Sequence, residues 1–539
     1  MEGTGNGSPP GLRLISAGNA AAMDKEAYAE WDLTSFDLVE KAGLLCAAAL
    51  KTELLQNSKY SPCLCGPILV CAGTGNNGAD ALVLLGELVK TRAGKNPNAA
   101  VLLSRYPTAE ENSPRARALR NLQEMGVPVV SWNGKEHAAG LFDNAALIID
   151  GIAGTGIKGE LGGPPLEMVN ELNARGGRCC VVSIDVPSGA YSGWTGGQPV
   201  VRADITLAIE HLKTELYKPL LRLHCGKIIP VQGVFPAGLL EKHGDAWLLS
   251  WESCSCAIAP LDFGAYKYTR GLCEIHAGST GTAGAALLAA AGASAAGAGL
   301  IKAVLDDDLY PVLGAQFSGV MAAPCSAHQS GGNNFIPHSM LLGPGWGKGD
   351  GRLPALQQAL MAEESGAPVI LDADGIYLIK KLFPDLLSPG RKSPVFHGRV
   401  ILTPHAGELE SLSGIPKTEL LSNPQLIAGI AKTLNAVILF KSHVMVVSAP
   451  DGRLGFIDGM NPALGAGGSG DFLAGLCAGI AARAYAAEKA GEGRFDPFLA
   501  AAAAGALLVA AAGAMGRRFF DPGELALPAA RLAGQAWLP

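Results

Sequence analysis

Apolar runs alternate with helical patterns along the first half of the chain. The runs PILVCAG, AAVLLS, ALIIDGIAG and CCVVSIDVPSG are separated by segments with helical spacing, such as ADALVLLGELVK and SPRARALRNLQEMG. Short β-rich runs joined by amphipathic helices are typical of βαβ units, in which helices cover both faces of a parallel sheet. The first half therefore predicts a doubly wound α/β domain.

A second alternating series occupies the other half of the chain. It contains GLCEIHAGS, a long Ala/Gly-rich helical segment, HSMLLGPGWG, APVILDADG, GRVILTPHAGE and AVILFKSHVMVV. Between about residues 233 and 264 the pattern loses its period, and 539 residues exceed one typical domain. We therefore expect two tandem α/β domains, 1–245 and 246–539, with the boundary near residue 245.

The segment FLAAAAAGALLVAAAGAMG, residues 498–516, imitates a membrane span because it carries no charge. Most of its residues are Ala and Gly, which contribute little transfer free energy, and Arg494 and Asp496 closely precede it. These features favour a buried, closely packed helix over a membrane span.

Composition narrows the class of protein and its partners. A net charge of -6, from 42 basic and 48 acidic residues, provides no broad positive surface and argues against nucleic acid as the main partner. The 12 cysteines lack zinc-site spacing, and MEGTGNGSPPG lacks the regions of a secretory signal. We expect reduced cysteines, a cytoplasmic location and small-molecule substrates. The Ala/Gly-rich helices can pack tightly against neighbours, and a homo-oligomer is expected.

Three glycine-containing turns follow three predicted strands. AGTGNNGADAL opens a helix, whose first amides favour an anion, although an ordinary strand-to-helix turn explains this motif equally well. Asp150 ends a second strand, and Asp185 and Ser188 follow a third. Because ligands of open parallel sheets bind outside the carboxyl ends of the strands, we expect the three turns to converge in one crevice.

In this order, GNNGAD, DGIAGTG and DVPSG resemble the NAD(P)H-hydrate epimerase domain, whose pattern is GNNGGDG, DxxxGTG and DIPSG. Ala79, Ala81 and Ala190 depart from that pattern. The resemblance implies a Rossmann-like domain whose substrate contacts are Asp185 together with Asn76, Asn77, Gly78, Ala79, Asp80, Gly154, Thr155, Gly156, Ile157, Lys158, Gly159 and Glu160. It also implies a potassium ion bound by hard oxygen ligands from Asn77, Asp150 and Ser188.

Asp185 is the candidate catalytic residue of this first site. Epimerisation at a hydroxyl-bearing ring carbon requires an acid/base group within hydrogen-bond reach of the reacting atoms. The alternative is that Asp185 only caps the turn that follows its strand.

The stretch GAGGSGDFLAG resembles a phosphate loop but has no lysine after its glycines. Backbone amides at a helix start bind phosphate without a lysine, and an adjacent carboxylate can take a proton from a substrate hydroxyl. Asp471 is therefore the candidate base, with a simple helix cap as the alternative.

Five motifs in order resemble the NAD(P)H-hydrate dehydratase domain of the ribokinase-like superfamily: HAGSTGTAGAALLAAAGASAAGAGL, LLGPGWG, LDADG, LTPHAGE and NPALGAGGSGDFLAG. The resemblance implies that Ala285, Gly345, His405 and Asp471 contact the hydrated nicotinamide. Nucleotide binding is implied for Lys441, Ser442, His443, Val444, Met445 and Gly470. Ser442 stands where the family has Gly, which tolerates positive φ better.

Two of these motifs also have a purely structural interpretation. A histidine between a strand and a glycine, such as His405, is often only a turn residue. Asp372 and Asp374 of LDADG are expected to position a loop rather than to act in catalysis.

Together the two resemblances predict a bifunctional repair enzyme for hydrated NADH and NADPH. The first domain would epimerise the R and S hydrates, and the second would dehydrate the S form with ADP, or ATP, as phosphate donor and Mg²⁺ beside the nucleotide. One alternative is a ribokinase-like kinase of a vitamin precursor. Another is that the first domain is a non-catalytic binding module.

Overall fold

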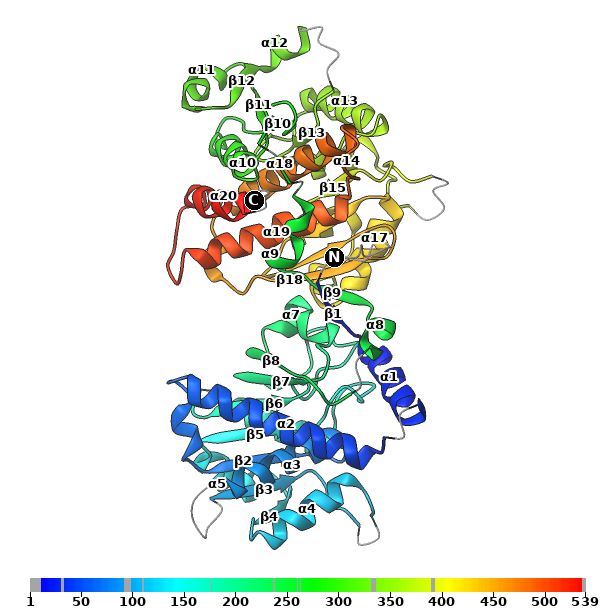
Figure 1. The fold of residues 1–539 in the computed structure, drawn as a ribbon, viewed down its shortest axis with the longest axis vertical. Helices are drawn as coiled ribbons and strands as arrows, with labels where there is room; N and C mark the ends of the chain where they lie inside the picture. Colours follow the sequence, from blue (N-terminus) through cyan, green and yellow to red (C-terminus); the bar gives the residue numbers. More distant parts are fainter. Residues whose placement is uncertain are drawn as a thin grey trace. The chain divides into compact units, whose positions relative to one another are not determined.

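The computed structural model describes residues 11–30, 33–91, 98–108, 111–175, 177–235, 238–258, 260–261, 263–330, 336–388 and 393–535. Residues 1–10, and with them most of the segment considered for a secretory signal, lie outside this part. The chain forms two compact units, Arg13–Ala246 and a second unit from Trp247 onward (Figure 1). The predicted α/β class with two tandem units is confirmed.

The first unit is built on a seven-stranded sheet with the order β4-β3-β2-β5-β6-β7-β8, in which all the neighbouring strands are parallel. Its strands are β2 (Ile68–Ala72), β3 (Ala99–Leu103), β4 (Val129–Ser131), β5 (Leu147–Gly151), β6 (Cys180–Ile184), β7 (Ile205–Ile209) and β8 (Lys227–Val231). Its helices are α1 (Ala17–Glu30), α2 (Ser35–Gln56), α3 (Asn76–Lys90), α4 (Pro114–Glu124), α5 (Lys135–Asn144), α6 (Gly163–Ala174), α7 (Pro219–Arg222) and α8 (Leu239–His243).

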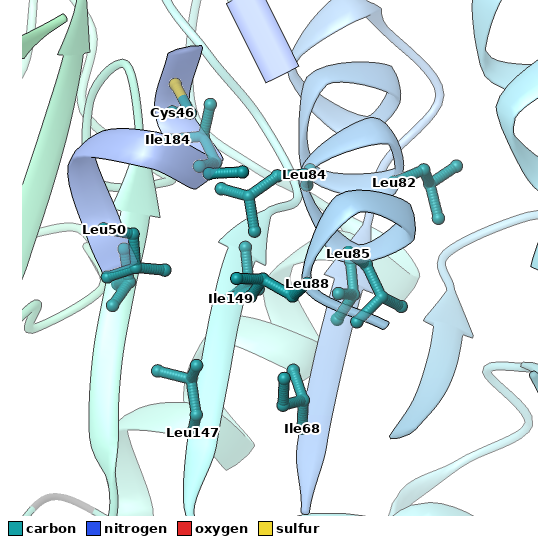
Figure 2. Close-up of a cluster of buried hydrophobic side chains, with 14 of the residues drawn as sticks. Cys46, Leu50, Ile68, Leu82, Leu84, Leu85, Leu88, Leu147, Ile149 and Ile184 are labelled. Carbon is teal, nitrogen blue, oxygen red and sulfur yellow. The ribbon is translucent and has the colours of Figure 1, made fainter. Parts of the chain in front are cut away.

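Helices cover both faces of this sheet, as expected for buried parallel strands. On one face, Leu50 of α2 and Leu84 of α3 pack on Ile149 of β5 and its neighbours (Figure 2). On the other, Phe142 of α5 and Met168 of α6 belong to a second buried cluster. Each such apolar side chain contributes about 1.5–3 kcal/mol on burial. This doubly wound arrangement leaves the carboxyl ends of the strands to carry the site.

The second unit contains a larger sheet, which from β9 onward has the order β9-β18-β17-β16-β15-β14-β13-β10-β11-β12. The strands are β10 (Leu272–His276), β11 (Leu300–Leu305), β12 (Met321–Pro324), β13 (Ser339–Leu342), β14 (Val369–Leu371), β15 (Val400–Leu402), β16 (Val437–Phe440), β17 (Val444–Ser448) and β18 (Leu454–Asp458). The short strands β1 (Leu12–Leu14) and β9 (Ala246–Leu248) lie where the chain divides. The sheet is parallel from β12 to β16, and β17 is antiparallel to both its neighbours.

The helices of this unit are α9 (Trp251–Cys254), α10 (Gly284–Ala295), α11 (Tyr310–Leu313), α12 (Cys325–Ser330), α13 (Leu353–Glu364), α14 (Asp374–Leu382), α15 (Ala406–Ser413), α16 (Lys417–Ser422), α17 (Pro424–Leu434), α18 (Ser469–Lys489), α19 (Pro497–Ala514) and α20 (Ala526–Gly534). Short parallel strands joined by these helices place most of the predicted second-site motifs at strand ends.

The small residues of the Ala/Gly-rich helix α10 pack against α18 of the same chain. A Cβ on Gly475 would lie 2.0 Å from the carbonyl oxygen of Ala289, and one on Gly292 would lie 2.2 Å from that of Phe472. Such distances are sterically impossible, so these positions require glycine. The small residues of α10 are therefore buried against α18 of the same chain. They give no reason to expect a homo-oligomer.

The apolar segment considered as a membrane span forms helix α19, and its predicted burial is confirmed. Among the described residues, α19 is the helix long and apolar enough to cross a membrane, yet 67% of this window is buried within the protein. It contacts α18, β16 and β18 of its own unit. The 12 cysteines all lie in the described part and form no disulfide.

Two candidate active sites

The first candidate site lies at the carboxyl ends of β2, β5 and β6. Asp150 at the end of β5 is fully buried and accepts hydrogen bonds from Ser183 Oγ at 2.7 Å, Ser188 Oγ at 2.5 Å and Ser188 N at 2.9 Å. Burial raises the pKa of Asp150, and the hydrogen bonds from Ser188 and Ser183 oppose that shift. Two of the three predicted potassium ligands, Asp150 and Ser188, are therefore in direct contact.

The side chain of Asn77, the third predicted potassium ligand, is buried with its Oδ1 and Nδ2 atoms unbonded to any described residue. A Cβ on Gly154 would lie 3.1 Å from Asn77 Cγ, so the amide packs directly on this loop. Ser188 Oγ accepts a hydrogen bond from Ala153 N at 2.8 Å, one residue earlier in the same loop. An orphaned amide oxygen beside a carboxylate and a hydroxyl fits a hard cation.

Asp185, the predicted acid/base residue, adopts a left-handed backbone conformation with φ of 66°. Non-glycine residues adopt this conformation rarely and at an energetic cost, which functional sites often bear. Its carboxylate accepts a hydrogen bond from the ammonium of Lys213 and a long one, at 3.4 Å, from Thr155 Oγ1. The Asp185 carboxylate is thus held by side chains, and not only by its own turn.

Lys213 was not found by sequence analysis. It lies four residues beyond β7, the strand next to β6, and its ammonium also donates to the carbonyl oxygen of Ile209 at 2.7 Å. Its side chain is only 8% exposed and that of Asp185 13%, so the ion pair is largely shielded from water. The strand-end rule that singled out Asp185 applies to Lys213 too, but no glycine motif marks it.

A pocket of about 140 Å³ opens beside this ion pair. Asp24 and Tyr28 from α1, Asp80 from α3, and His211 line it together with Asp185. Burial raises the pKa of Asp80 well above its usual range, and the charge of Asp185 adds to the shift. Burial lowers the pKa of His211 to about 4, with Lys213 adding to the effect, so the imidazole is neutral. Asp24, Tyr28 and His211 were also missed, because their contact with the site depends on long-range folding.

The family-implied substrate residues divide into two groups. Asn76, Asn77, Asp80, Gly154 and Asp185 line the pocket, and Gly78 and Ala79 lie buried in the first turn of α3. The rest of the second loop does not line this pocket. Thr155 contacts the pocket only through its hydrogen bond to Asp185. The remaining predicted substrate residues of the loop lie outside the pocket: Gly156, Ile157, Lys158, Gly159 and Glu160. Glu160 instead accepts a hydrogen bond from Gln198 at 3.0 Å.

Ala79 and Ala81, which stand where the epimerase pattern has glycine, are compatible with the fold. Ala79 and Ala81 lie inside helix α3, are fully buried and have no positive φ. Alanine favours a helix over glycine by about 1 kcal/mol. These substitutions therefore stabilise the helix without displacing the loop.

The second candidate site lies where the glycine-rich loop enters α18. Gly468 has a φ of 95° and precedes the helix, and Asp471 is the third helical residue. Ser469 Oγ donates to the carbonyl oxygen of Leu464 at 2.8 Å and so ties the loop to the helix start. The start of this 21-residue helix favours an anion, although the first amide, that of Ser469, already donates to the carbonyl oxygen of Ala466 at 3.3 Å.

Lys441 occupies the centre of a cluster of carboxylates beside Asp471. Its ammonium lies 2.5 Å from Asp372 Oδ1 and 3.7 Å from Glu408 Oε2. Burial opposes its charged form, but Asp372 and Glu408 outweigh that effect and leave the pKa of Lys441 raised. Asp372 also accepts a hydrogen bond from Thr403 Oγ1 at 2.7 Å, consistent with the positioning role expected for it. Its partnership with Lys441 was not foreseen.

Asp471 has the titration expected of a base. Burial, followed by the charge of Asp372, raises the pKa of Asp471 to about 6, and Lys441 opposes the shift. A carboxylate with this pKa is ionised at neutral pH and accepts protons more strongly than an ordinary aspartate. A residue that only caps the helix would not require burial beside Asp372 and Lys441.

The nucleotide residues implied by the resemblance gather around a pocket of about 490 Å³. Lys441, Ser442, His443, Met445 and Gly470 line it. Val444 does not, because it is fully buried in β17. Ser442 has no positive φ, and its hydroxyl donates to the carbonyl oxygen of Val444, so serine is accommodated where the family has glycine.

His405 lines this pocket and a neighbouring one, and it also caps helix α15. Its Nδ1 accepts hydrogen bonds from the amides of Gly407 at 3.0 Å and Glu408 at 3.2 Å, which assigns the proton of the neutral ring to Nε2. His405 is therefore both a turn residue and a side chain exposed to the site. The two interpretations made from the sequence are compatible.

Ala285 and Gly345 lie against each other, and neither of them lines the nucleotide pocket or the neighbouring pocket at His405. A Cβ on Gly345, where φ is 52°, would lie 2.9 Å from Ala285 Cβ. The carbonyl oxygen of Gly345 accepts hydrogen bonds from Thr282 Oγ1 at 2.7 Å and Ser279 Oγ at 2.9 Å. Two loops are thereby joined, and a larger residue at position 345 would separate them.

Each half of the chain matches a known protein family. Residues 274–527 match the family described as NAD(P)H-hydrate dehydratase, and residues 35–215 match the YjeF-related protein N-terminus. The bifunctional NAD(P)H-hydrate repair enzyme Nnr of Salinibacter ruber is 28% identical over 87% of this chain and 88% of its own. Its namesake from Gloeobacter violaceus is 30% identical over 83% of this chain and 84% of its own. This chain belongs to the bifunctional NAD(P)H-hydrate repair enzyme family.

A solved structure is similar to about half of the chain. The ADP/ATP-dependent NAD(P)H-hydrate dehydratase of Bacillus subtilis, co-crystallised with ATP and Mg²⁺, is 26% identical, covers 53% of this chain and 97% of its own, and has a TM-score of 0.45. Because members of the repair enzyme family match both halves in one chain, the repair function is favoured over a vitamin-precursor kinase with a non-catalytic first domain.

Proposed function

We propose that the first unit epimerises the R and S hydrates of NADH and NADPH, and that the second dehydrates the S hydrate with a nucleotide as phosphate donor. The observation that carries this proposal is Asp471, a carboxylate with a pKa of about 6 beside both a glycine-rich helix start and Lys441. The Asp185–Lys213 pair supplies the matching acid/base group in the first unit. Two complementary sites on one chain allow both epimers to be repaired.

In the first site, we assign proton exchange with the ring hydroxyl to Asp185. Lys213 holds the carboxylate in place by a direct ion pair. Burial raises the pKa of Asp80, which lines the same pocket, and so favours the protonated form that donates a hydrogen bond. A hydrate bound there would have an acceptor for the hydroxyl proton and a donor for the ring nitrogen as the bond between that nitrogen and the hydroxyl-bearing carbon breaks to leave an aldehyde. Both protons return when the nitrogen adds to the other face of the aldehyde, which gives the other epimer.

Potassium fits the first site through Asn77, Asp150 and Ser188. When bound, the ion would supply a fixed positive charge between the two loops. The unbonded amide of Asn77 is the observation that supports this assignment, since a buried amide without partners is costly.

Replacing potassium by tetramethylammonium is expected to lower the rate of epimerisation about tenfold or more, because the larger cation cannot enter between the loops. Asn77→Leu should lower the rate in potassium and abolish its dependence on the ion. The measurement is R-to-S conversion by chiral chromatography, with dehydration by the same chain as the internal control. Equal epimerisation rates in the two salts would contradict the assignment.

In the second site, we assign Asp471 as the base that takes the proton of the ring hydroxyl as the hydroxyl oxygen attacks the terminal phosphoryl group of the nucleotide. The bond between that phosphorus and its bridging oxygen breaks, and the nucleotide leaves as AMP from ADP or as ADP from ATP. The amides at the start of α18 and the ammonium of Lys441 stabilise the charge that develops on the phosphoryl oxygens. Phosphate then departs with the carbon–oxygen electron pair. Loss of a proton from the neighbouring ring carbon restores the double bond.

Magnesium fits this site by the chemistry of its donors, because the carboxylates of Asp374 and Glu408 are hard oxygen ligands whose charges act on Asp471, although both line the neighbouring pocket and not the nucleotide pocket. When bound with the nucleotide, it would neutralise phosphate charge. Each of these carboxylates already accepts a backbone hydrogen bond, Asp374 from Gly347 at 2.7 Å and Glu408 from His405 at 2.8 Å, so both are held in place beforehand.

The dehydration rate is expected to fall as the pH decreases through about 6, because protonated Asp471 cannot accept the hydroxyl proton. The group is ionised above its pKa, so the rate should reach a plateau above pH 7 and lose about tenfold per pH unit below 5. The measurement is kcat/KM for the S hydrate at saturating nucleotide. A rate that stays constant down to pH 4.5 would rule out Asp471 as the base.

The test of the whole proposal is to incubate the purified chain with a mixture of R and S hydrates and follow both by chromatography, first with ADP and then with ATP. We expect both epimers to disappear with one nucleotide or both, and NAD(P)H to appear in equal amount. Loss of the S form alone would restrict the function to the second unit. No loss of either form would refute it.

A cytoplasmic location and a homo-oligomeric state also belong to this proposal. The 12 cysteines of the chain form no disulfide, which supports a reducing compartment such as the cytoplasm. Size-exclusion chromatography with light scattering would determine the oligomeric state.

A further inference from the structure

A second pocket opens on the other side of His405 from the nucleotide pocket. Its volume is about 260 Å³, and it is lined by residues from α14, α15 and the loop after β13: Lys348, Ala373, Asp374, Ile376, Tyr377, Lys380, His405, Gly407, Glu408, Ser411 and Leu412. None of the glycine-rich loop residues that line the nucleotide pocket lines this one. The glycine-rich loop therefore borders a different space, and the part of this pocket beyond Asp374 and Glu408, the carboxylates assigned to magnesium, is available to another ligand.

The outer part of the pocket is basic and aromatic. The ammonium of Lys348 lies 4.7 Å from the ring centre of Tyr377, whose side chain is 44% exposed, and Lys380 donates a hydrogen bond to the carbonyl oxygen of Ser411. Among the described residues, no carboxylate forms an ion pair with Lys348 or Lys380. Two ammonium groups without an ion-pair partner beside an exposed ring are suited to a phosphate on a ribose, with the adjoining sugar or base against the ring.

The inner part of the pocket reaches the reaction site. Asp374 and Glu408 line the pocket, and both are close enough to Asp471 for their charges to raise its pKa. The loop that carries Lys348 also carries Gly345, three residues earlier. Gly347 N donates to Asp374 Oδ2 at 2.7 Å, which fixes this loop to the start of α14 and holds Lys348 beside Tyr377.

We propose that this pocket binds a phosphate-bearing part of the hydrated dinucleotide, with Lys348 and Lys380 as its phosphate ligands and Tyr377 against the adjoining group. This inference rests on the proposed dehydration of the S hydrate. A substrate whose ring hydroxyl is at Asp471 extends past Asp374 to the two lysines. The phosphate is either the 2′-phosphate, which only the NADPH hydrate has, or the pyrophosphate that both hydrates share.

The test compares the chain with the double variant Lys348→Gln, Lys380→Gln, which keeps side-chain length and hydrogen bonding but removes both charges. The KM and kcat for the S hydrates of NADPH and NADH are measured separately at saturating nucleotide. We expect the KM for the NADPH hydrate to rise about tenfold or more, with kcat nearly unchanged, because charged hydrogen bonds to phosphate are lost. A rise for the NADPH hydrate alone identifies the 2′-phosphate, and equal rises identify the pyrophosphate.

Lys381→Gln is the matched control, because Lys381 follows Lys380 on α14 but forms an ion pair with Asp350 and does not line the pocket. Its KM values should equal those of the unaltered chain. If the unaltered chain dehydrates the S hydrate and the double variant shows the same KM values as Lys381→Gln, the phosphate subsite is refuted while the function stands. If the unaltered chain does not dehydrate the hydrate at all, the proposed function itself fails.

Discussion

Asp471→Asn is expected to lower nucleotide-dependent dehydration of the S hydrate by about 10²- to 10⁴-fold, the range associated with loss of a general base. Asparagine keeps the shape and the helix start but cannot accept the hydroxyl proton. Because Asp471 is a carboxylate with a pKa of about 6, the loss should be largest above pH 6, where the native residue is ionised. The measurement is single-turnover conversion of the S hydrate.

Two controls separate this role from a structural one. Epimerisation by the same variant should be unchanged, since the first site lies in the other unit. Nucleotide affinity, measured by calorimetry, should also change little, because Asp471 does not line the nucleotide pocket. Full dehydration activity in Asp471→Asn would show that Asp471 only caps α18.

Asp185→Asn is expected to lower epimerisation by about 10²- to 10⁴-fold while dehydration of pure S hydrate continues. Asparagine is among the residues that tolerate a left-handed φ, so the 66° conformation at this position should survive. Lys213→Met should cause a smaller loss, because the carboxylate remains but its ion-pair partner is gone. The measurement is R-to-S conversion without nucleotide.

The control for the lysine variant is Lys59→Met, which removes an exposed lysine that pairs with Asp204 in the same unit. It should leave epimerisation unchanged. Dehydration by the same variant distinguishes positioning from a folding defect of the whole chain, since it should continue at the native rate. A Lys213→Met variant with a native rate of epimerisation would remove Lys213 from the site.

Local patterns in the sequence were sufficient for the fold class and for much of both sites. The turns at Asp150, Asp185 and Asp471 each follow a recognisable strand or open a helix, and the backbone geometry of such turns depends mainly on the residues within them. The same reasoning correctly assigned residues 498–516 to a buried helix, because their small side chains suit close packing. It also suggested that the Ala/Gly-rich helix could pack against neighbouring chains, whereas the structure packs it on α18.

Only the folded chain shows which charged groups meet. Lys213 approaches Asp185 across 28 residues, and Lys441 approaches Asp372 across 69, so neither pair forms a sequence motif. The raised pKa of Asp471 and the orphaned amide of Asn77 likewise arise from burial and from side chains on other strands. Glycine turns and strand ends are local, and the sequence specifies them directly. Charge pairing and desolvation depend on distances between remote segments, which the tertiary structure alone determines.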